Sequence, residues 1–268
     1  MPALNIVQQG EGRPVLALHG FGPDHRQMAG ILEPLFAGCP GYRRIYPDLP
    51  GFGRSPIGEV RSSVEMVAVL AELFDELVTE GKLLLVGYSY GGYLAAELAR
   101  RRRAQVAGLA LICPLVIPQF NERELPTHQV LVRDPAAVAD LELAERVQFE
   151  TSAVVQTRET LTRFTAEVAS GLHAHDAVAA SRLQINDYGL PESPYADAES
   201  AEFPVLIIAG RQDSIVGYRD QWRPARGYPR ATLAVLDAAG HQAALERPAL
   251  TAALLTDWLD RVASNTHR

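Results

Sequence analysis

The stretch from residue 83 to residue 92 constrains the fold more than any other part of this chain. It begins with an unbroken apolar run at 83–86, continues as Gly-Tyr-Ser-Tyr-Gly around Ser89, and leads directly into a helix-forming stretch at 93–103. A strand that is buried on both faces is typically apolar throughout, so residues 83–86 predict a central strand. The order strand, sharp turn, helix is the context in which Gly-x-Ser-x-Gly forms a nucleophile elbow.

Small residues flank Ser89 at the two positions where such a turn needs them. A turn that lifts one side chain clear of a sheet has a strained backbone, and it brings the helix very close to the strand. Gly87 and Gly91 provide the necessary space, and Ser89 lies at the apex. The five letters alone also fit an ordinary flexible loop. The strand before them and the helix after them favour the catalytic interpretation.

The order of strand-like and helix-like segments along the whole chain predicts an α/β fold with a mostly parallel, doubly wound sheet. Strand-like apolar runs alternate with segments whose apolar residues recur at helical spacing, as crossover helices between parallel strands require. The pattern Ser62-x-x-Glu65 predicts a capping box at the start of one helix. The expected strands are residues 4–8, 13–18, 44–46, 83–86, 106–113, 204–210 and 232–236, and the expected helices are 28–36, 64–78, 93–103 and 248–262.

Residues 118–202 lack strand-like runs and are predicted to form a helical cap, inserted into a core made of residues 1–117 and 203–268. Amphipathic patterns predict helices at 135–150, 152–171 and 173–186. An insertion of this length between two strands is typical of a lid over a functional site. The substrate walls are expected to be the Phe21 and Tyr90 side chains below and the cap above. Apolar cap residues such as Leu161, Phe164 and Val168 either face the substrate or pack among themselves.

Charge and hydropathy limit the partners. The formal net charge of −7 and the isoelectric point near 5.5 argue against nucleic acid or an anionic membrane surface. The first residues lack the basic start and apolar run of a signal peptide, and no stretch approaches the roughly 20 apolar residues that span a bilayer. Two cysteines, Cys39 and Cys113, predict no disulfide framework. We therefore expect a cytoplasmic protein that binds a small-molecule substrate; the oligomeric state is left open.

Three polar residues follow predicted strands in the order Ser89, Asp213, His241. The carboxyl ends of parallel strands meet at one edge of a sheet, so these side chains can converge although they are far apart in sequence. A serine hydroxyl is a weak nucleophile until an imidazole removes its proton, and a carboxylate fixes the tautomer of that imidazole. Asp48 is an alternative acid, but a carboxylate so close to a strand end more often braces a loop.

The loop His19-Gly20-Phe21-Gly22 follows a predicted strand and can supply backbone N–H groups to the same edge. In an enzyme with a nucleophile elbow, the residue after the nucleophile supplies one oxyanion-hole donor and an earlier loop supplies the other. We expect these donors to be the N–H groups of Tyr90 and Phe21, with Gly22 as a weaker candidate. His19 is expected to hold its own loop in place rather than contact substrate.

Together these motifs resemble those of the α/β-hydrolase superfamily, in its single-domain bacterial branch with a helical cap. The resemblance implies that Ser89 is the nucleophile, His241 the general base and Asp213 its partner. Ser89 excludes the mechanism of relatives that use an aspartate nucleophile, such as epoxide hydrolases and haloalkane dehalogenases. Only one strand is expected before Arg13, where many relatives have two. The motifs that carry the resemblance are residues 19–22, 48–55, 87–92, 210–213 and 240–241.

Several functions are compatible with this site. The leading hypothesis is a serine hydrolase that cleaves a small ester, thioester or lactone through an acyl-enzyme. The alternatives are hydrolysis of a carbon–carbon bond in a diketo-acid type of substrate, a cofactor-free perhydrolase, and a ligand-binding receptor on the same fold. Acyl specificity depends on cap and loop side chains, so the sequence does not identify the substrate.

We expect the activity to need no cofactor and no metal. The pair His173-x-His175 lacks a third ligand in the sequence, and both residues, like His128, are expected at the surface. Dialysis against a chelator should therefore leave the rate of ester hydrolysis unchanged. Complete loss of activity that added zinc restores would contradict this expectation.

Overall fold

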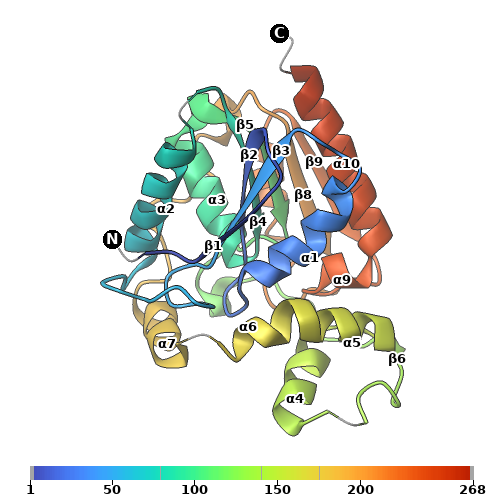
Figure 1. Cartoon of the computed structure of the whole chain (residues 1–268). Coiled ribbons are helices and arrows are strands. Elements are labelled where there is room, and N and C mark those ends of the chain that lie inside the picture. The colour runs from blue at the N-terminus through green and yellow to red at the C-terminus, as the bar shows by residue number, and fades with distance from the viewer. Residues whose placement is uncertain (1–2, 79, 140, 175, 266–268) are drawn as a thin grey trace.

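The computed structural model, which describes residues 3–78, 80–139, 141–174 and 176–265, is built around a seven-stranded sheet (Figure 1). The strands are β1 (Ile6–Gln9), β2 (Arg13–Leu18), β3 (Tyr42–Pro47), β4 (Leu83–Tyr88), β5 (Val106–Ile112), β8 (Val205–Gly210) and β9 (Ala231–Leu236). Their order is β1-β3-β2-β4-β5-β8-β9, and every neighbouring pair is parallel except β1 with β3. The prediction of a mostly parallel sheet is confirmed, and β1 is the strand expected before Arg13.

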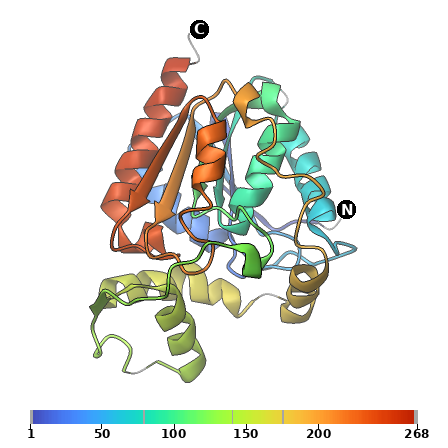
Figure 2. The same ribbon diagram turned by 180° about the vertical axis from the view of Figure 1, so that it is seen from behind.

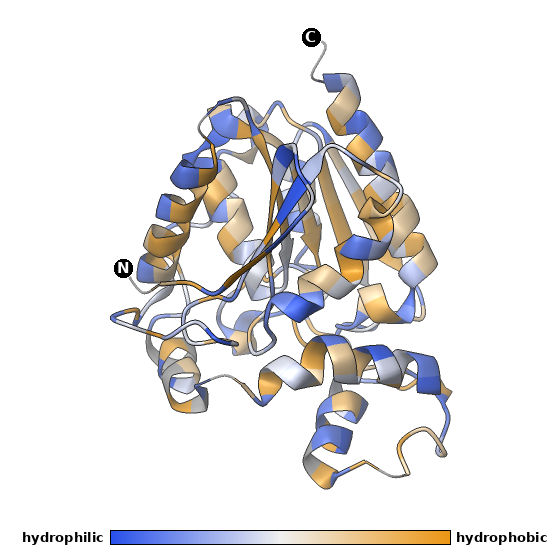
Figure 3. Cartoon of the chain, in the orientation of Figure 1, coloured by the Kyte–Doolittle hydropathy of each residue, from blue (hydrophilic) through white to orange (hydrophobic). Residues whose placement is uncertain are grey.

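The most deeply buried strands of the sheet are β4 and β8, whose sequences are almost entirely apolar. All six residues of β4 and all six of β8 are buried, whereas Gln8 and Gln9 at the end of β1 are exposed. β4 pairs with β2 on one side and with β5 on the other. Figure 3 shows the central strands mainly in hydrophobic colours. The ends of β2 and β5 therefore lie beside that of β4.

Helices cover both faces of the sheet, so the fold is doubly wound as predicted. The core helices are α1 (His25–Phe36), α2 (Ser63–Leu77), α3 (Tyr90–Arg101), α8 (Trp222–Gly227), α9 (Ala243–Glu246) and α10 (Pro248–Asn265). α1 packs against α10 on one face, and α2 packs against α3 on the other (Figures 1 and 2). None of the helices in the described part of the chain has both the length and the apolar character needed to cross a bilayer.

The predicted capping box at the start of α2 is half formed. The Ser62 hydroxyl accepts a hydrogen bond from the Glu65 N–H at 3.2 Å, as a capping residue should. The Glu65 carboxylate, however, accepts from the N–H of Arg61 at 2.6 Å and not from that of Ser62. The helix therefore begins where the pattern predicts, with the return bond displaced by one residue.

Between β5 and β8 the chain forms an insertion that lies across one edge of the sheet (Figure 1). Its elements are η2 (Phe120–Glu122), β6 (Val132–Arg133), α4 (Leu143–Ser152), β7 (Val155–Gln156), α5 (Arg158–Phe164), η3 (Thr165–Ala169), α6 (Ser170–Leu172), α7 (Ala177–Asn186) and η4 (Ala198–Ser200). η3 is a π-helical segment that joins α5 to α6 and packs on α1. The helical insertion is confirmed, while its division from the core at residues 118 and 202 remains a prediction.

The helices of the insertion start later than predicted. α4 begins eight residues after the expected position because Asp134 N–H is bonded to Gln156 O at 2.9 Å, which holds this segment beside β7. α5 begins after Thr157, whose hydroxyl caps it, because the two preceding residues belong to β7. β7 pairs with β6 in a short parallel ladder that the sequence did not predict. α7 likewise begins at residue 177 rather than 173.

The start of α3 lies so close to the end of β2 that only glycine fits at position 91. A Cβ atom there would lie 2.3 Å from the carbonyl oxygens of both Leu18 and His19. At position 87 a Cβ atom would lie 2.4 Å from the carbonyl oxygen of Gly91. All of these neighbours are backbone atoms, which cannot rotate away as a side chain can. The two glycines therefore allow the strand-turn-helix unit to close against β2.

We expect Gly91→Ala to lower the free energy of unfolding by about 1–3 kcal/mol, the usual range for overpacking. Alanine favours helix by about 1 kcal/mol over glycine, so the clash decides the sign of the effect. Gly38→Ala is the matched control, because nothing lies within 4 Å of the added Cβ. Urea unfolding of both variants measures the difference. If Gly91→Ala were as stable as Gly38→Ala, the close approach of α3 to the end of β2 would be wrong.

Candidate active site

Ser89 lies at the turn between β4 and α3 in a backbone conformation that few non-glycine residues adopt. Its φ is 51° and its ψ is −116°, a type of strain that costs about 1–3 kcal/mol and persists only where neighbouring contacts hold it. The Ser89 N–H donates to Ile112 O at 2.9 Å, and the Ser89 carbonyl accepts from Tyr93 N–H at 3.1 Å and Leu115 N–H at 3.0 Å. The end of β5 and the first turn of α3 thus hold the strained residue.

His241 and Asp213 complete a chain of hydrogen bonds that begins at Ser89. His241 Nδ1 lies 2.9 Å from Asp213 Oδ2, and His241 Nε2 lies 3.1 Å from Ser89 Oγ. A carboxylate only accepts, so Nδ1–H donates to Asp213 and Nε2 accepts from the Ser89 hydroxyl. The loops after β4, β8 and β9 therefore bring together the three residues that the sequence analysis singled out. Their action as a catalytic triad remains a prediction.

Asp213 is fully buried, and its environment keeps it ionised. Its Oδ1 accepts hydrogen bonds from the N–H of Ile215 at 2.9 Å and of Val216 at 3.0 Å. Burial alone would raise the pKa of Asp213, but the charge and hydrogen bond of His241 and the two backbone N–H groups hold that pKa below its ordinary value. A carboxylate that stays charged at neutral pH orients the His241 ring and stabilises its protonated form.

Glu246 holds the backbone beside His241, a role that no sequence pattern indicated. Its Oε2 accepts from Gly240 N–H at 2.6 Å, and its Oε1 accepts from Val154 N–H at 2.6 Å and Val155 N–H at 3.0 Å. Burial raises the pKa of Glu246 to about 7, against the effect of these three donors. One carboxylate therefore joins the histidine loop to the insertion. A single acidic residue at the end of the four-residue helix α9 gave no sequence signal for this role.

The two backbone groups predicted to form an oxyanion hole are both available. Neither Phe21 N–H nor Tyr90 N–H has a hydrogen-bond acceptor among the residues that the structure describes. Gly20, the neighbour of Phe21, donates its N–H to Gln27 Oε1 at 2.8 Å, which ties the loop after β2 to α1. The assignment of Phe21 and Tyr90 as oxyanion donors stays a prediction that these free donors support.

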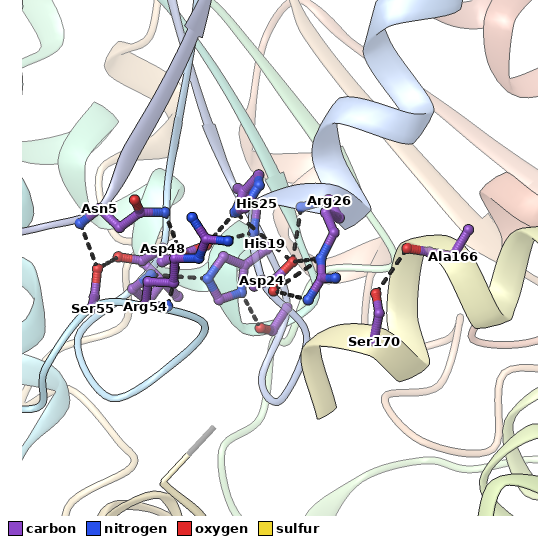
Figure 4. Close-up of polar contacts among 12 residues, drawn as sticks. Asn5, His19, Asp24, His25, Arg26, Asp48, Arg54, Ser55, Ala166 and Ser170 are labelled. Atoms are coloured by element: carbon purple, nitrogen blue, oxygen red, sulfur yellow. Dashed lines mark hydrogen bonds and ion pairs between the residues drawn. The ribbon is translucent and has the colours of Figure 1, made fainter. Parts of the chain in front are cut away.

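Asp48 braces the loop after β3 and accepts hydrogen bonds from three residues (Figure 4). Its Oδ1 accepts from the backbone N–H of His25 at 2.9 Å and from His25 Nδ1 at 2.7 Å. Its Oδ2 accepts from Asn5 Nδ2 at 2.8 Å and Arg54 N–H at 2.9 Å. Burial acts to raise the pKa of Asp48, but these donors bring it well below its ordinary value. This is the loop-bracing arrangement expected from the sequence.

His19 is fully buried and holds two loops together (Figure 4). Its Nδ1–H donates to Gly20 O at 2.7 Å, and its Nε2 accepts from Leu49 N–H at 2.9 Å. Burial lowers the pKa of His19, which favours the neutral ring that this pair of hydrogen bonds requires. The geometry agrees with the structural role expected for this histidine.

A cavity of about 270 Å³ opens beside Ser89 and His241, between the sheet edge and the insertion. Phe164 and Val168 line it, whereas Leu161 does not, and all three residues belong to the hydrophobic core. The expectation that cap residues contact the substrate remains a prediction. The remaining lining residues are Gly20, Phe21, Pro23, Gln27, Tyr88, Leu115, Arg123, Gln148, Thr151, Ser152, Leu172, Tyr188, Ile215, Val216 and Gln242.

The Tyr90 side chain is not a wall of this cavity, contrary to the sequence-based expectation. Tyr90 is fully buried, and its hydroxyl lies 2.7 Å from Ser63 Oγ. Its ring stacks on Tyr188 with centroids 4.7 Å apart, and Tyr188 lines the cavity in its place. The helix start directs the Tyr90 side chain behind the site while its N–H stays beside Ser89. Phe21 lines the cavity as expected.

The histidines of the insertion form no metal site in the described part of the chain. His128 and His173 are exposed, and His175 lies outside the described residues. Two other groups of three potential ligands do converge, which the sequence did not predict: Cys113 with Asp213 and His241, and Asp24 with His25 and Asp48. In both groups, hydrogen bonds within the protein already occupy carboxylate oxygens. The expectation that no metal is needed remains a prediction.

Residues 13–248 match the sequence profile of the α/β hydrolase fold, which covers most of the chain. The protein therefore belongs to the α/β-hydrolase family. It is 27% identical to the pimeloyl-(acyl-carrier protein) methyl ester esterase of Shewanella woodyi, over 97% of this chain and 98% of that protein. It is 28% identical to the 2-hydroxy-6-oxononadienedioate/2-hydroxy-6-oxononatrienedioate hydrolase of Cupriavidus pinatubonensis, over 91% of this chain and 86% of that protein.

A solved structure with the same architecture is that of an α/β superfamily hydrolase from Oenococcus oeni PSU-1. The two chains are 25% identical and superpose with a TM-score of 0.89, over 97% of this chain and 96% of the other. The likeness extends over both the sheet and the insertion. It supports the family assignment and does not name a substrate.

The contacts of the two aspartates predict different effects of removing their charges. Asp213→Asn should lower kcat/KM by about 10⁴-fold, because an amide can donate to His241 and stabilise the wrong tautomer. Asp48→Asn should leave the activity of the folded protein within a few-fold. It should instead lower the unfolding free energy by about 1–3 kcal/mol, because buried donors lose their acceptor. Kinetics and urea unfolding of both variants separate the two roles. A crippled Asp48→Asn enzyme beside a mild Asp213→Asn enzyme would reverse the assignment.

Proposed function

We propose that this protein is a serine hydrolase that cleaves a small ester, thioester or lactone through an acyl-enzyme. The observation that carries the proposal is the continuous hydrogen-bonded chain from Ser89 Oγ through His241 to Asp213, placed at a cavity. A cavity that exposes an activated serine to a small molecule is what acyl transfer requires.

In the proposed mechanism, the substrate carbonyl lies against Ser89 with its oxygen toward the N–H groups of Phe21 and Tyr90. His241 Nε2 takes the hydroxyl proton as Ser89 Oγ attacks, and Asp213 stabilises the resulting imidazolium. The two N–H groups stabilise the negative charge of the tetrahedral intermediate. His241 then donates its proton to the leaving group. A water molecule, activated in the same way, releases the acid and restores Ser89.

Hydrolysis of a carbon–carbon bond is the second candidate. It is supported by the similarity to the Cupriavidus pinatubonensis hydrolase, at 28% identity, because that chemistry can be carried out on the same family fold. The esterase of Shewanella woodyi, at 27% identity and with almost complete coverage, supports the ester reaction. A perhydrolase and a receptor have no observation in their favour here. Comparison of turnover on nitrophenyl esters, lactones and vinylogous diketo acids distinguishes the two candidates.

We expect Ser89→Ala to fold normally and to lower kcat on the preferred substrate by on the order of 10⁶-fold, as in other serine triads. The alanine removes the attacking oxygen, while the backbone contacts of residue 89 remain. Turnover of the substrate panel by the wild type and the variant, with circular dichroism as the folding control, measures this loss. If the purified variant kept even a few per cent of wild-type turnover, Ser89 would not be the nucleophile.

A further inference from the structure

Arg123 brings a permanent positive charge to the cavity that contains Ser89. The residue belongs to the segment that follows β5 and crosses the sheet edge into the insertion, drawn in green in Figure 2. Among the described residues that line this cavity, it is the only arginine or lysine, and no aspartate or glutamate lines it. The proposed mechanism gives this guanidinium no part in the reaction.

Neutral groups hold the Arg123 guanidinium in place. Nε donates to Ile117 O at 2.8 Å, Nη1 to Ile215 O at 2.8 Å and Nη2 to Pro118 O at 2.7 Å. The Phe120 ring lies against it, with the guanidinium carbon 5.3 Å from the ring centroid. A guanidinium has five N–H donors, so one donor remains on each Nη atom. The side chain is therefore oriented before any ligand arrives.

The charge of Arg123 lacks a close counter-ion. No carboxylate oxygen lies within 4.0 Å of it in the part of the chain that the structure describes. By contrast, two other partly buried arginines have partners: Arg44 lies 2.6 Å from Glu33, and Arg163 lies 2.7 Å from Glu167. Burial lowers the pKa of Arg123, and only more distant groups, including Asp213, act against this. A partly buried charge without a partner is costly, which favours an anion supplied by a ligand.

Arg123 is connected to the loop of Asp213 through the backbone of Ile215. The Ile215 carbonyl that holds Nη1 belongs to the residue whose N–H donates to Asp213 Oδ1. The cavity volume of about 270 Å³ lies below the roughly 300–1,000 Å³ typical of sites for drug-sized ligands. An anionic group at Arg123 is therefore separated from a carbonyl at Ser89 by only a few carbon atoms.

We propose that Arg123 is a substrate-binding residue that recognises a carboxylate, so that the preferred substrate is a monoester or monothioester of a short dicarboxylic acid, or a small lactone that carries a carboxylate. This inference rests on the proposed hydrolase function and names its substrate class. The two free N–H donors, one on each Nη, match the two oxygens of a carboxylate. A single positive charge balances a monoanion and not a phosphate dianion. Gln148 and Gln242, whose buried Oε1 atoms lack partners among the described residues, also line the cavity and supply neutral hydrogen-bonding groups.

Two substrates of equal shape test the role of this charge. The mono-p-nitrophenyl ester of glutaric acid has a terminal carboxylate, and p-nitrophenyl 5-methylhexanoate has two methyl groups in place of its oxygens. The wild type should prefer the glutarate ester. Arg123→Gln should lower kcat/KM for the glutarate ester by about 10- to 100-fold, the effect of losing a hydrogen-bonded charge pair. The loss of the hydrogen bond to Ile215 O affects both esters alike, so the ratio of kcat/KM for the glutarate ester to that for the neutral ester should fall by at least about tenfold. Arg123→Lys should retain part of the preference.

Arg219→Gln is the matched control. Arg219 is exposed and does not line the cavity, and its Nη1 lies 4.0 Å from Glu124 Oε2. This substitution removes the same charge nearby and should leave the ratio of the two rates unchanged. The rate with Ser89→Ala, subtracted throughout, corrects for attack by the ester's own carboxylate. An equal fall on both esters in Arg123→Gln would reveal a purely structural residue. A wild-type protein that hydrolysed both esters equally well would also overturn the inference. The proposed hydrolase function would then still stand, because esters are hydrolysed.

A binding measurement tests the inference without turnover. Calorimetric titration of Ser89→Ala with monomethyl glutarate should give a dissociation constant at least tenfold lower than the same titration of the Ser89→Ala, Arg123→Gln double variant. Inorganic phosphate should bind more weakly than monomethyl glutarate. Equal affinity of the two proteins for monomethyl glutarate would overturn carboxylate recognition, and tighter binding of phosphate would assign the site to a phosphorylated ligand. If Ser89→Ala bound monomethyl glutarate while the wild type hydrolysed no ester, only the proposed hydrolase function would be contradicted.

Discussion

The strained backbone of Ser89 links the packing of the sheet to the geometry of the site. A non-glycine residue with φ of 51° is stable here only because three hydrogen bonds, from Ser89 N–H to Ile112 O and to Ser89 O from two further N–H groups, hold it. Those bonds require β5 beside β4 and α3 directly after the turn. The close approach of α3 in turn requires Gly91, since any side chain there meets the carbonyl oxygens at the end of β2. The result is a hydroxyl presented above a buried sheet edge.

The order of the strands then determines which groups can reach that hydroxyl. β8 and β9 lie beyond β5 on the same side of β4, so the loops after them bring Asp213 and His241 to one place. The Asp213 side chain is held by two N–H groups of its own loop. The backbone at His241 is held by the Glu246 carboxylate and by the hydroxyl of Tyr88. Glu246 also binds the insertion, and Arg123 binds the Asp213 loop, so the cavity walls and the proposed catalytic groups are held by shared contacts.

The sheet and the positions of the polar site residues could be predicted because both follow from apolar runs that end in unusual residues. Ser89 and Asp213 come shortly after the buried strands β4 and β8, His241 follows the half-buried β9, and parallel strand ends meet. The insertion was less predictable, because its helix bounds depend on contacts with residues distant in sequence. β6 and β7 have two residues each, too few for a periodic pattern, and their pairing moves the start of α5. Tyr90 shows the same limit: its backbone position follows from the motif, while its side-chain direction depends on packing with Ser63 and Tyr188.

If His241 and Asp213 make Ser89 a nucleophile, a reagent that bonds covalently to activated serines should react with this protein. A fluorophosphonate reacts only with a serine whose proton a neighbouring base can remove. After incubation of the folded protein with this reagent, intact mass should show one adduct per chain, and peptide mapping should place it on Ser89. The Asp213→Asn protein should be labelled far more slowly. An unlabelled wild-type protein, or an adduct on a different residue, would contradict the account.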